Sequence, residues 1–271
     1  MKITKGKIIL LIIVAYFVIF AIINVNKEKD VNQFILDNVV YVKDGKVDPN
    51  NDGKLVLVSG KIESDNYVTF MELDEKFKSI KAKRIVEDYI KNDDGDYEWT
   101  ERNEPLSNAN GDYLKSLICD EKVSDVKIGE YELDEKGLSL IKDDSYYSKQ
   151  PEVLGLITTG IDYSRDPYEE NLKEGDIKLT YKYYDLDKHP NMSVLAVQKG
   201  NSFESYKYDK KEEVYQVFDS LVNDKETLTK ELKANVKKTI RGKSLFIILI
   251  IGIGIFFIVD NRKGKKEEKK N

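Results

Sequence analysis

Two long apolar runs lie near the ends of the chain, at residues 8–25 and within residues 244–260. Residues 8–23 of the first run and residues 245–259 of the second contain no charged side chain. A helix needs about 20 apolar residues to cross a hydrocarbon core about 30 Å thick, and a helix that is apolar on every side has no polar face for water. The pattern therefore predicts two transmembrane helices, at 8–25 and at 244–260.

A cleaved signal peptide is the alternative for the first run, because Lys2, Lys5 and Lys7 form a basic segment before it. Such a peptide ends in a cleavage site of small residues, and the residues after Val25 do not provide one. A retained anchor is therefore favoured. For the second run the alternative is a buried core helix, which the absence of a polar face disfavours.

Alternating apolar and polar positions between the two runs predict a β-rich region. Residues 54–62 alternate with period two, and the turn Asp93–Asp96 is predicted to join strands at 82–90 and 97–100 as a hairpin. Val39–Val42 and residues 54–62 flank a second polar turn that also suggests a hairpin. Further strands are predicted at 177–184, 194–198, 203–208 and 214–218.

A helix is predicted from Asn223 or Asp224, either of which is a suitable N-cap, with apolar residues at i, i+4 spacing that continue toward the second apolar run. The predicted fold is a membrane-anchored α+β protein, with a β-rich non-cytoplasmic domain between an N-terminal and a C-terminal transmembrane helix. The predicted segments are a basic cytoplasmic N-terminus (1–7), a transmembrane helix (8–25), an acidic β-rich extracytoplasmic domain (26–222), an amphipathic juxtamembrane helix (223–243), a transmembrane helix (244–260) and a basic cytoplasmic tail (261–271).

The charge distribution supports this topology. The formal net charge of the 271 residues is -5; residues 1–25 contribute +3 and residues 237–271 contribute +7, so residues 26–236 carry -15. Basic ends favour the cytoplasmic side of a membrane, so both termini are predicted to be cytoplasmic. The acidic middle disfavours nucleic acid as a partner, because it would repel phosphates.

Few residues suggest metal or redox chemistry. One cysteine and one histidine exclude an intramolecular disulfide and a zinc site of the usual kind. Asp48, Asn50, Asp52 and Gly53 match the first half of a calcium-binding loop, but Ser59 stands where a bidentate glutamate is needed. A polar hairpin turn is therefore the favoured interpretation.

Catalytic constellations are not apparent either. Acidic clusters at Asp93–Asp96 and at Asp185 and Asp187 suggest solvated turns, His189 follows in such a turn, and Cys119 ends a short apolar run where a buried thiol is expected. No nucleotide-binding or metalloprotease motif is present. The sequence therefore predicts no enzyme activity, no metal and no cofactor, and the alternative function is an envelope cation sensor or hydrolase that uses clustered aspartates.

A series of short motifs occurs in one order from about residue 8 to residue 250. It includes the segment 51–61 (NDGKLVLVSGK), Tyr97-Glu98-Trp99, the segment 174–181 (EGDIKLTY) and the segment 194–200 (VLAVQKG). This ordered set resembles the luminal domain of the LUMA family of nuclear-envelope transmembrane proteins. The residues that we take as the family signature are Gly53, Lys54, Gly60, Trp99, Gly175, Asp176 and Gly200.

The resemblance implies an integral membrane protein with a scaffolding or membrane-organising role that is exercised through its extracytoplasmic domain. The partners that it implies are the lipid bilayer and either another envelope protein or a second copy of the chain. The sequence departs from the family at its C-terminus, where one apolar run stands in place of several spans. The bias toward Lys, Ile, Asn and Asp suggests a bacterial cell membrane; in a eukaryote the nuclear envelope or endoplasmic reticulum is expected.

Overall fold

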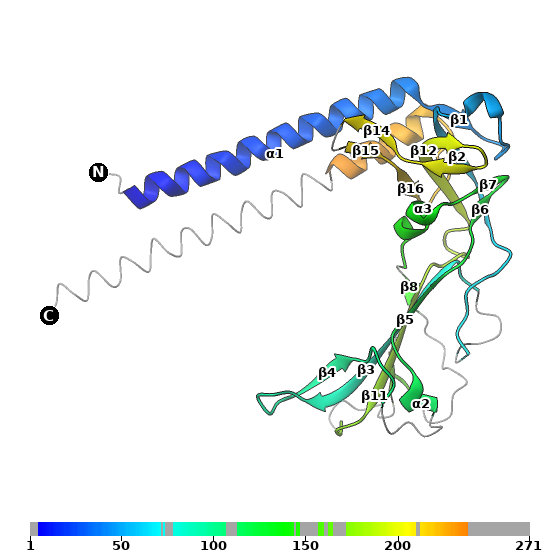
Figure 1. Cartoon of the computed structure of the whole chain (residues 1–271). Helices are drawn as coiled ribbons and strands as arrows, with labels where there is room; N and C mark the ends of the chain where they lie inside the picture. Colours follow the sequence, from blue (N-terminus) through cyan, green and yellow to red (C-terminus); the bar gives the residue numbers. More distant parts are fainter. Residues whose placement is uncertain are drawn as a thin grey trace. The chain divides into compact units, whose positions relative to one another are not determined.

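The computed structural model describes residues 5–71, 73, 78–106, 113–143, 145–146, 157–159, 162–164, 172–209 and 212–237. The chain divides into two compact units (Figure 1). Unit 1 combines Met1–Val39 with Asp224–Asn271, and unit 2 is Val40–Asn223.

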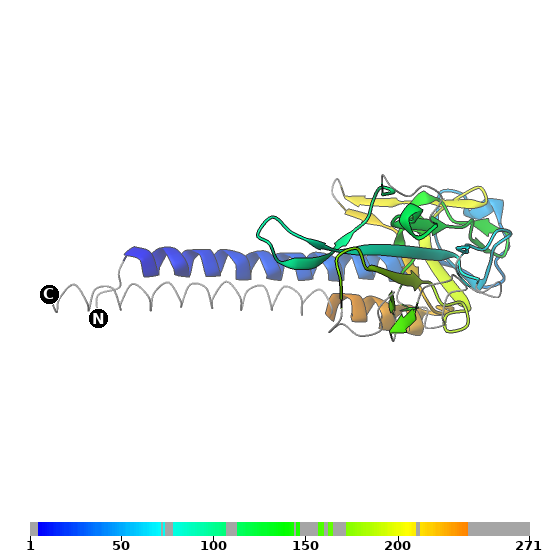
Figure 2. The same ribbon diagram turned by 90° about the horizontal axis from the view of Figure 1, so that it is seen from below.

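The part of unit 1 that the structure describes forms two helices that pack side by side (Figure 2). The first is α1 (Lys5–Asn38), and the second covers residues 225–237. The second helix begins as predicted at Asp224, whose carboxylate accepts a hydrogen bond of 2.8 Å from the N–H of Thr227. Lys225 lies 3.9 Å from Asp37, and Asn32 donates to the carbonyl of Leu232. Asp37 follows Asn32 in α1, whereas its partner Lys225 precedes Leu232 in the second helix. The two helices are therefore antiparallel.

The prediction of a domain flanked by transmembrane helices is wrong. In the described part of the chain, no helix combines the length and the apolar character that a membrane crossing requires. The predicted helix boundary at Val25 is also absent, because α1 continues through the charged residues Lys27–Asp30 to Asn38. Backbone hydrogen bonds extend a helix whatever the polarity of its side chains, so the end of an apolar run does not end the helix. The second predicted span, 244–260, lies outside the described residues.

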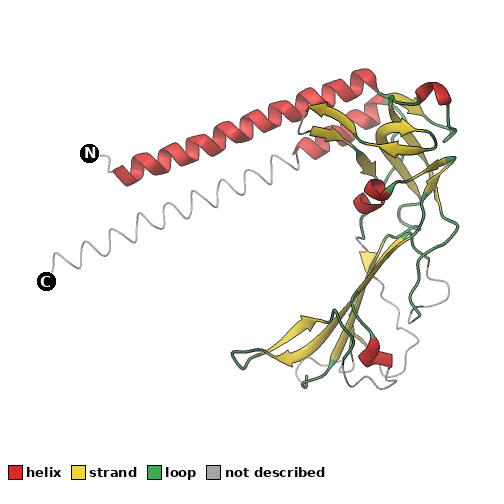
Figure 3. Cartoon of the chain, viewed as in Figure 1, coloured by secondary structure: helices red, strands yellow, loops and turns green. Residues whose placement is uncertain are grey.

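Unit 2 is β-rich, and its described residues form two sheets of seven strands each (Figure 3). The first sheet has the order β13-β12-β2-β6-β7, with β1 beside β2 and β16 beside β12. Its strands are β1 (Val40–Val42), β2 (Leu55–Glu63), β6 (Lys127–Ile128), β7 (Tyr131–Glu132), β12 (Asn191–Lys199), β13 (Ser202–Glu204) and β16 (Gln216–Phe218). Strands β2 and β12 are central and buried along most of their length, as expected for strands packed on both faces.

The second sheet has the order β4-β3-β11-β10-β9, with β5 beside β3 and β8 beside β11. Its strands are β3 (Lys81–Lys91), β4 (Tyr97–Glu101), β5 (Asp120–Val123), β8 (Ser145–Tyr146), β9 (Ile157–Thr159), β10 (Asp162–Ser164) and β11 (Ile177–Tyr183). The remaining elements of unit 2 are the strand pair β14 (Tyr206–Asp209) and β15 (Glu212–Val214), the 3-10 helix η1 (Pro49–Asn51), α2 (Tyr113–Ser116) and α3 (Glu135–Leu140).

Each sheet has its own hydrophobic core. In the first sheet Val56, Val58 and Val194 pack against Ile128 and Tyr131. In the second sheet, alternate residues of β3 and β11 pack against α2 and against the segment that contains Phe70; they include Val86, Leu179 and Tyr181. Since side chains alternate across a strand, the intervening residues of β3 and β11 belong to the opposite face of that sheet.

Two turn predictions had different outcomes. The Asp93–Asp96 turn joins β3 and β4 in an antiparallel hairpin as predicted, with Gly95 at φ 91°. The predicted hairpin between residues 39–42 and 54–62 is wrong, because β1 and β2 are parallel, with Val40 opposite Val56. The residues between them, 43–54, form a crossover connection and not a reversal.

Candidate interaction surface

Three aromatic side chains line one face of the β3–β4 hairpin. Tyr89 lies directly opposite Trp99, and Lys91 lies directly opposite Tyr97, which places all four residues on one face. The rings of Tyr89 and Tyr97 are nearly parallel, with centroids 5.5 Å apart. The rings of Tyr89 and Trp99 are tilted relative to each other, with centroids 5.1 Å apart. We call Tyr89, Tyr97 and Trp99 the aromatic row. Tyr97 is 46% exposed and the other two rings are half-buried.

Two lysines flank the aromatic row. The ammonium of Lys178 lies 5.6 Å from the ring centroid of Trp99, and that of Lys91 lies 6.0 Å from the ring centroid of Tyr97. Lys178 also lies 3.2 Å from the carboxylate of Glu87. A cation over an aromatic face is attracted by the ring quadrupole, so these lysines hold the rings in place while the row stays accessible.

Two signature residues, Gly175 and Asp176, bind the backbone of Tyr89, which lies opposite a third, Trp99. The N–H of Gly175 donates to the carbonyl of Tyr89, and the N–H of Tyr89 donates to the carbonyl of Asp176, both at 2.9 Å. Gly175 has φ 89°, a conformation that glycine adopts without a steric cost. The turn before β11 is thereby fixed to β3 near its C-terminal end, at the residue whose ring pairs with Trp99.

The other signature residues lie in the first sheet. The N–H of Gly53 donates to the carbonyl of Gln198, and the N–H of Gln198 donates to the carbonyl of Lys54. The N–H of Gly200 donates to the Asp52 carboxylate at 2.8 Å. Gly60 faces Ile128, whose Cγ2 would lie 3.0 Å from an added Cβ. These positions have structural roles in joining the η1 turn and β6 to the central strands.

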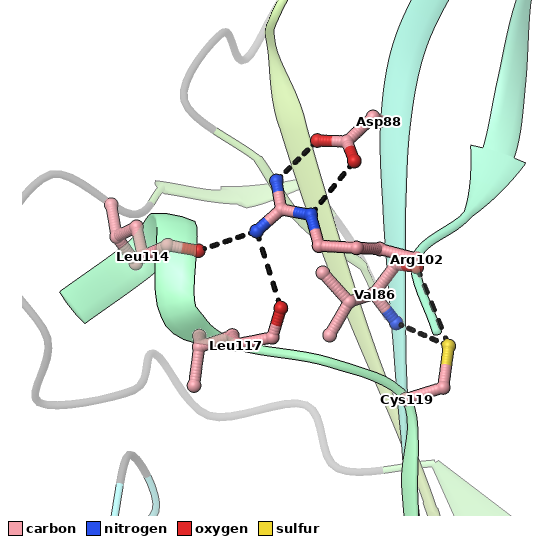
Figure 4. A network of polar contacts seen from close by, with 6 residues as sticks. All are labelled: Val86, Asp88, Arg102, Leu114, Leu117 and Cys119. Atoms are coloured by element: carbon pink, nitrogen blue, oxygen red, sulfur yellow. Dashed lines mark hydrogen bonds and ion pairs between the residues drawn. The ribbon is translucent and has the colours of Figure 1, made fainter. Parts of the chain in front are cut away.

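A buried ion pair supports the aromatic row from the opposite face (Figure 4). Arg102 is 4% exposed and holds both oxygens of Asp88, with a distance of 2.7 Å from Nε to Oδ2. Its Nη1 donates to the carbonyls of Leu114 and Leu117 at 2.7 and 3.2 Å. Asp88 precedes Tyr89 in β3, so its side chain lies on the covered face. The guanidinium therefore ties α2 and the residues after it to the hairpin.

Sequence reasoning missed this ion pair. Asp88 is one of 49 acidic residues and Arg102 one of 44 basic residues, and no motif distinguishes either of them. Cys119 lies beside the pair: its sulfur accepts the N–H of Val86 at 3.3 Å and is only half-buried. The thiol thus has a local structural role at the end of the segment that Arg102 holds.

The carboxylates of the segment that matches half of a calcium-binding loop already accept hydrogen bonds from groups of the protein itself. Asp48 accepts the N–H of Asn50 at 2.9 Å through its side chain, and its carbonyl accepts the amide of Gln198 at 2.8 Å. Asp52 accepts the N–H of Gly200. Across the residues that the structure describes, no group of three or more His, Cys, Asp or Glu could hold a metal ion.

The second acidic turn is organised by an asparagine. The N–H groups of Asp94 and Asp96 donate to the side-chain oxygen of Asn92 at 3.1 and 2.9 Å. His189 is half-buried, and its ring centroid lies 5.8 Å from that of Tyr184. The backbone N–H of His189 donates to the carbonyl of Asp185. The predicted open turn around the histidine is thus partly closed by Tyr184.

A polar cluster beside α3 has a structural role. The buried phenol of Tyr215 donates to the carboxylate of Asp134, which also caps α3 by accepting the N–H of Gly137. Burial, followed by the bond to Asp134, raises the pKa of Tyr215 above its ordinary value. Lys136 pairs with Glu213 and lies 2.6 Å from Ser205, and its ammonium lowers the pKa of Glu213. An ammonium held in an ion pair is not a base that could activate the serine hydroxyl.

The comparison with protein families agrees with the motifs that meet in the second sheet. A family model described as Transmembrane protein 43 matches residues 118–261, which is more than half of the chain. The chain belongs to the Transmembrane protein 43 family. This is the LUMA family that the sequence resembles, so that prediction is confirmed. No curated protein and no solved structure matches the chain.

Membership of the Transmembrane protein 43 family assigns the chain to a membrane. The matched range includes the signature residues Gly175, Asp176 and Gly200, and it includes β11 beside the aromatic row. Tyr89, Tyr97 and Trp99 precede the matched range. The aromatic row is therefore a feature of this chain that rests on a strand of the matched region.

Proposed function

We propose that this membrane protein has a structural, membrane-organising role and that unit 2 acts as a docking platform through the aromatic row. The observation that carries this proposal is the partly exposed aromatic surface, built on a sheet that a buried ion pair locks from behind. Tyr and Trp are enriched at protein interfaces, because they bury a large area at a small entropic cost. A pre-formed surface of this kind also avoids the cost of ordering side chains on binding.

The charge distribution supports one topology for this platform. Because the termini are basic, we infer that both lie in the cytoplasm and that the acidic middle region lies outside the cell, in a protein of a bacterial cell membrane. Protease added outside intact cells should cleave unit 2 and leave a C-terminal epitope tag intact. If the tag is cleaved and unit 2 is protected, the proposed orientation is wrong and the opposite one holds.

The partner class follows from the chemistry of the surface. The aromatic row presents apolar rings between lysines and glutamates, which suits a protein partner, either another envelope protein or a second copy of this chain. The row offers no array of unpaired cations for a polyanion, and the acidic region around it repels phosphates.

Photo-crosslinking in intact membranes tests the docking platform. A benzophenone amino acid at Tyr97 should give protein adducts, because this ring is the most exposed of the aromatic row. The matched control is the same probe at Tyr208 in β14, which is 36% exposed but belongs to a different strand pair. Adducts at both sites in equal yield, or at neither, would remove the support for a specific surface.

A further inference from the structure

Strand β4 forms one edge of the second sheet. It is the first strand in the order β4-β3-β11-β10-β9, and among the described residues it pairs only with β3. Four of its five residues are exposed and the fifth, Trp99, is half-buried. An edge strand presents unpaired N–H and C=O groups to any chain that can add another strand.

The hydrogen-bond register shows which groups of β4 point outward. The backbone N–H of Arg102 donates to the carbonyl of Val86 at 2.7 Å, and the backbone N–H of Asn92 donates to the carbonyl of Asp96 at 2.8 Å. Inward and outward pairs alternate along an antiparallel ladder. The backbone groups of residues 98 and 100 are therefore directed at β3, and those of residues 97, 99 and 101 are directed away from the sheet.

The edge lacks most of the features that prevent strand addition. Residues 97–101 contain no proline and no lysine, and the β3–β4 register runs from Glu87 to Lys91 without a bulge. By contrast, the β14–β15 pair has a register shift at Lys207. The only charged residues of β4 are Glu98 and Glu101, so the charges that these two meet decide which strand can be added.

The sequence of β4, YEWTE, is self-complementary about Trp99. In an antiparallel pair of two β4 strands centred on this residue, Trp99 lies opposite Trp99, each Glu98 lies opposite Thr100, and each Glu101 lies opposite Tyr97. Every glutamate then meets an uncharged residue, and all outward backbone groups of residues 97, 99 and 101 are paired. A shift of two residues in one direction would place Glu98 opposite Glu98, and a shift in the other direction would leave both Tyr97 and Glu98 unpaired within the five-residue strand.

We propose that two copies of this chain associate through β4, as an antiparallel pair centred on Trp99. This inference rests on the proposed docking function and names its partner as a second copy. The pairing brings the two aromatic rows together, because facing residues of an antiparallel pair lie on the same face. The rings of Tyr89 and Trp99 from each copy then form one continuous row of four across the interface.

The charge of the domain predicts how this association depends on salt. Residues 26–236 carry -15 in each copy, so two copies repel each other at long range, while the contact itself is made by backbone hydrogen bonds and rings. Salt screens the repulsion, so self-association should strengthen as ionic strength rises. A partner that is attracted by this acidic charge would dissociate instead.

Disulfide crosslinking tests the register in full-length protein in native membranes. In the Cys119→Ser background, Glu98→Cys in one tagged copy and Thr100→Cys in a second should crosslink under mild oxidation, since directly opposite non-hydrogen-bonded residues have Cα atoms about 4.5 Å apart. When only one of the two cysteine variants is present, each cysteine faces the unchanged Thr100 or Glu98 of the other copy and not a second cysteine. Each single variant should therefore give at most about one tenth of the disulfide-linked dimer that the mixed pair gives. Equal yields from the single variants would overturn the pairing.

Two charge variants provide an independent test. Trp99→Lys places two ammonium groups opposite each other and should abolish the dimer, whereas Tyr97→Lys places an ammonium opposite Glu101 and should preserve it. Dimer content is measured by the yield of the mixed disulfide, and circular dichroism checks that both variants are folded. Loss of the dimer in Tyr97→Lys, or its retention in Trp99→Lys, would contradict the register.

The outcome separates this inference from the proposed function. If the probe at Tyr97 captures another protein while the mixed cysteine pair does not crosslink, the docking role stands and self-pairing fails. If neither experiment gives a specific product, both fail. A mixed disulfide together with self-adducts from Tyr97 supports both.

Discussion

Replacing Arg102 by methionine tests whether the buried ion pair holds the second sheet together. The side chains of Arg102 and Asp88 are 3% and 11% exposed, so water cannot readily replace the lost guanidinium. Removal of one partner of such a pair costs about 3–5 kcal/mol, because a charge is left buried and uncompensated. The carbonyls of Leu114 and Leu117 lose their donor as well, which places the expected cost toward the upper end of that range.

The single tryptophan makes this cost measurable. Trp99 lies in β4, three residues before Arg102, so urea unfolding of the full-length protein in detergent, followed by its fluorescence, reports on this sheet. With a denaturant slope of about 2 kcal/mol per molar urea, the midpoint should fall by about 2 M. The fluorescence should also shift to longer wavelength at lower urea concentration than in the wild type.

Two further variants serve as controls for the effect of removing Arg102. Lys142→Met removes a pair with Asp219 whose lysine side chain is 60% exposed, and it should cost less than about 1 kcal/mol. Adding Asp88→Leu to Arg102→Met removes the orphaned carboxylate and should recover part of the loss. If Arg102→Met is no more destabilising than Lys142→Met, the guanidinium does not hold α2 on the sheet and the reasoning fails.

Three other expectations follow from local geometry. Gly129→Ala should cost about 2–5 kcal/mol in thermal or urea unfolding, because φ is 61° and the new Cβ would lie 2.5 Å from the carbonyl oxygen of Gly45. Gly200→Ala has nearly the same φ, 60°, but no atom within 4 Å, so it should cost only about 1–2 kcal/mol; equal costs would exclude the steric contribution. The raised pKa of Tyr215 should make stability fall as pH rises above about 10, where the phenol ionises in the unfolded chain but not beside Asp134, and Tyr215→Phe should flatten that decline. Millimolar calcium should leave the melting temperature unchanged, since the carboxylates of the η1 turn already accept backbone hydrogen bonds; a clear rise would restore the cation-sensor alternative.

Local sequence signals predicted the parts of the fold that short-range geometry decides. The turn between β3 and β4 was predictable because its aspartates and glycine and both of its strands are neighbours in sequence. The N-cap at Asp224 was predictable for the same reason. In each case the residues that make the structure lie within a few positions of one another.

The connection between β1 and β2 was not predictable in this way. Its polar residues fit a hairpin turn, yet they form a crossover because Asp48 and Gly53 bind Gln198, about 150 residues later in the chain. A local pattern specifies that the chain bends, whereas distant partners decide which strand it meets next. The end of α1 at Asn38 shows the same limit, since the apolar run indicated an earlier boundary.

The candidate surface was only partly visible in the sequence. Tyr97 and Trp99 belong to one motif of the resemblance, but Tyr89 joins them only through the register of β3 with β4. Neither the row nor the ion pair behind it has a characteristic spacing. Such sites are produced by pairing across strands, so they become visible only when the register is known.

The alternation of side chains in β3 separates the stability of the hairpin from its recognition surface. Asp88 points to the covered face, where Arg102 holds it, and Tyr89 points to the face that carries the aromatic row. Loss of Arg102 should therefore weaken both folding and docking, because the row depends on the sheet beneath it. Tyr97→Glu, which would place a carboxylate opposite Glu101 of the second copy, should weaken docking, while the urea midpoint stays near that of the wild type because Tyr97 is exposed and distant from the ion pair.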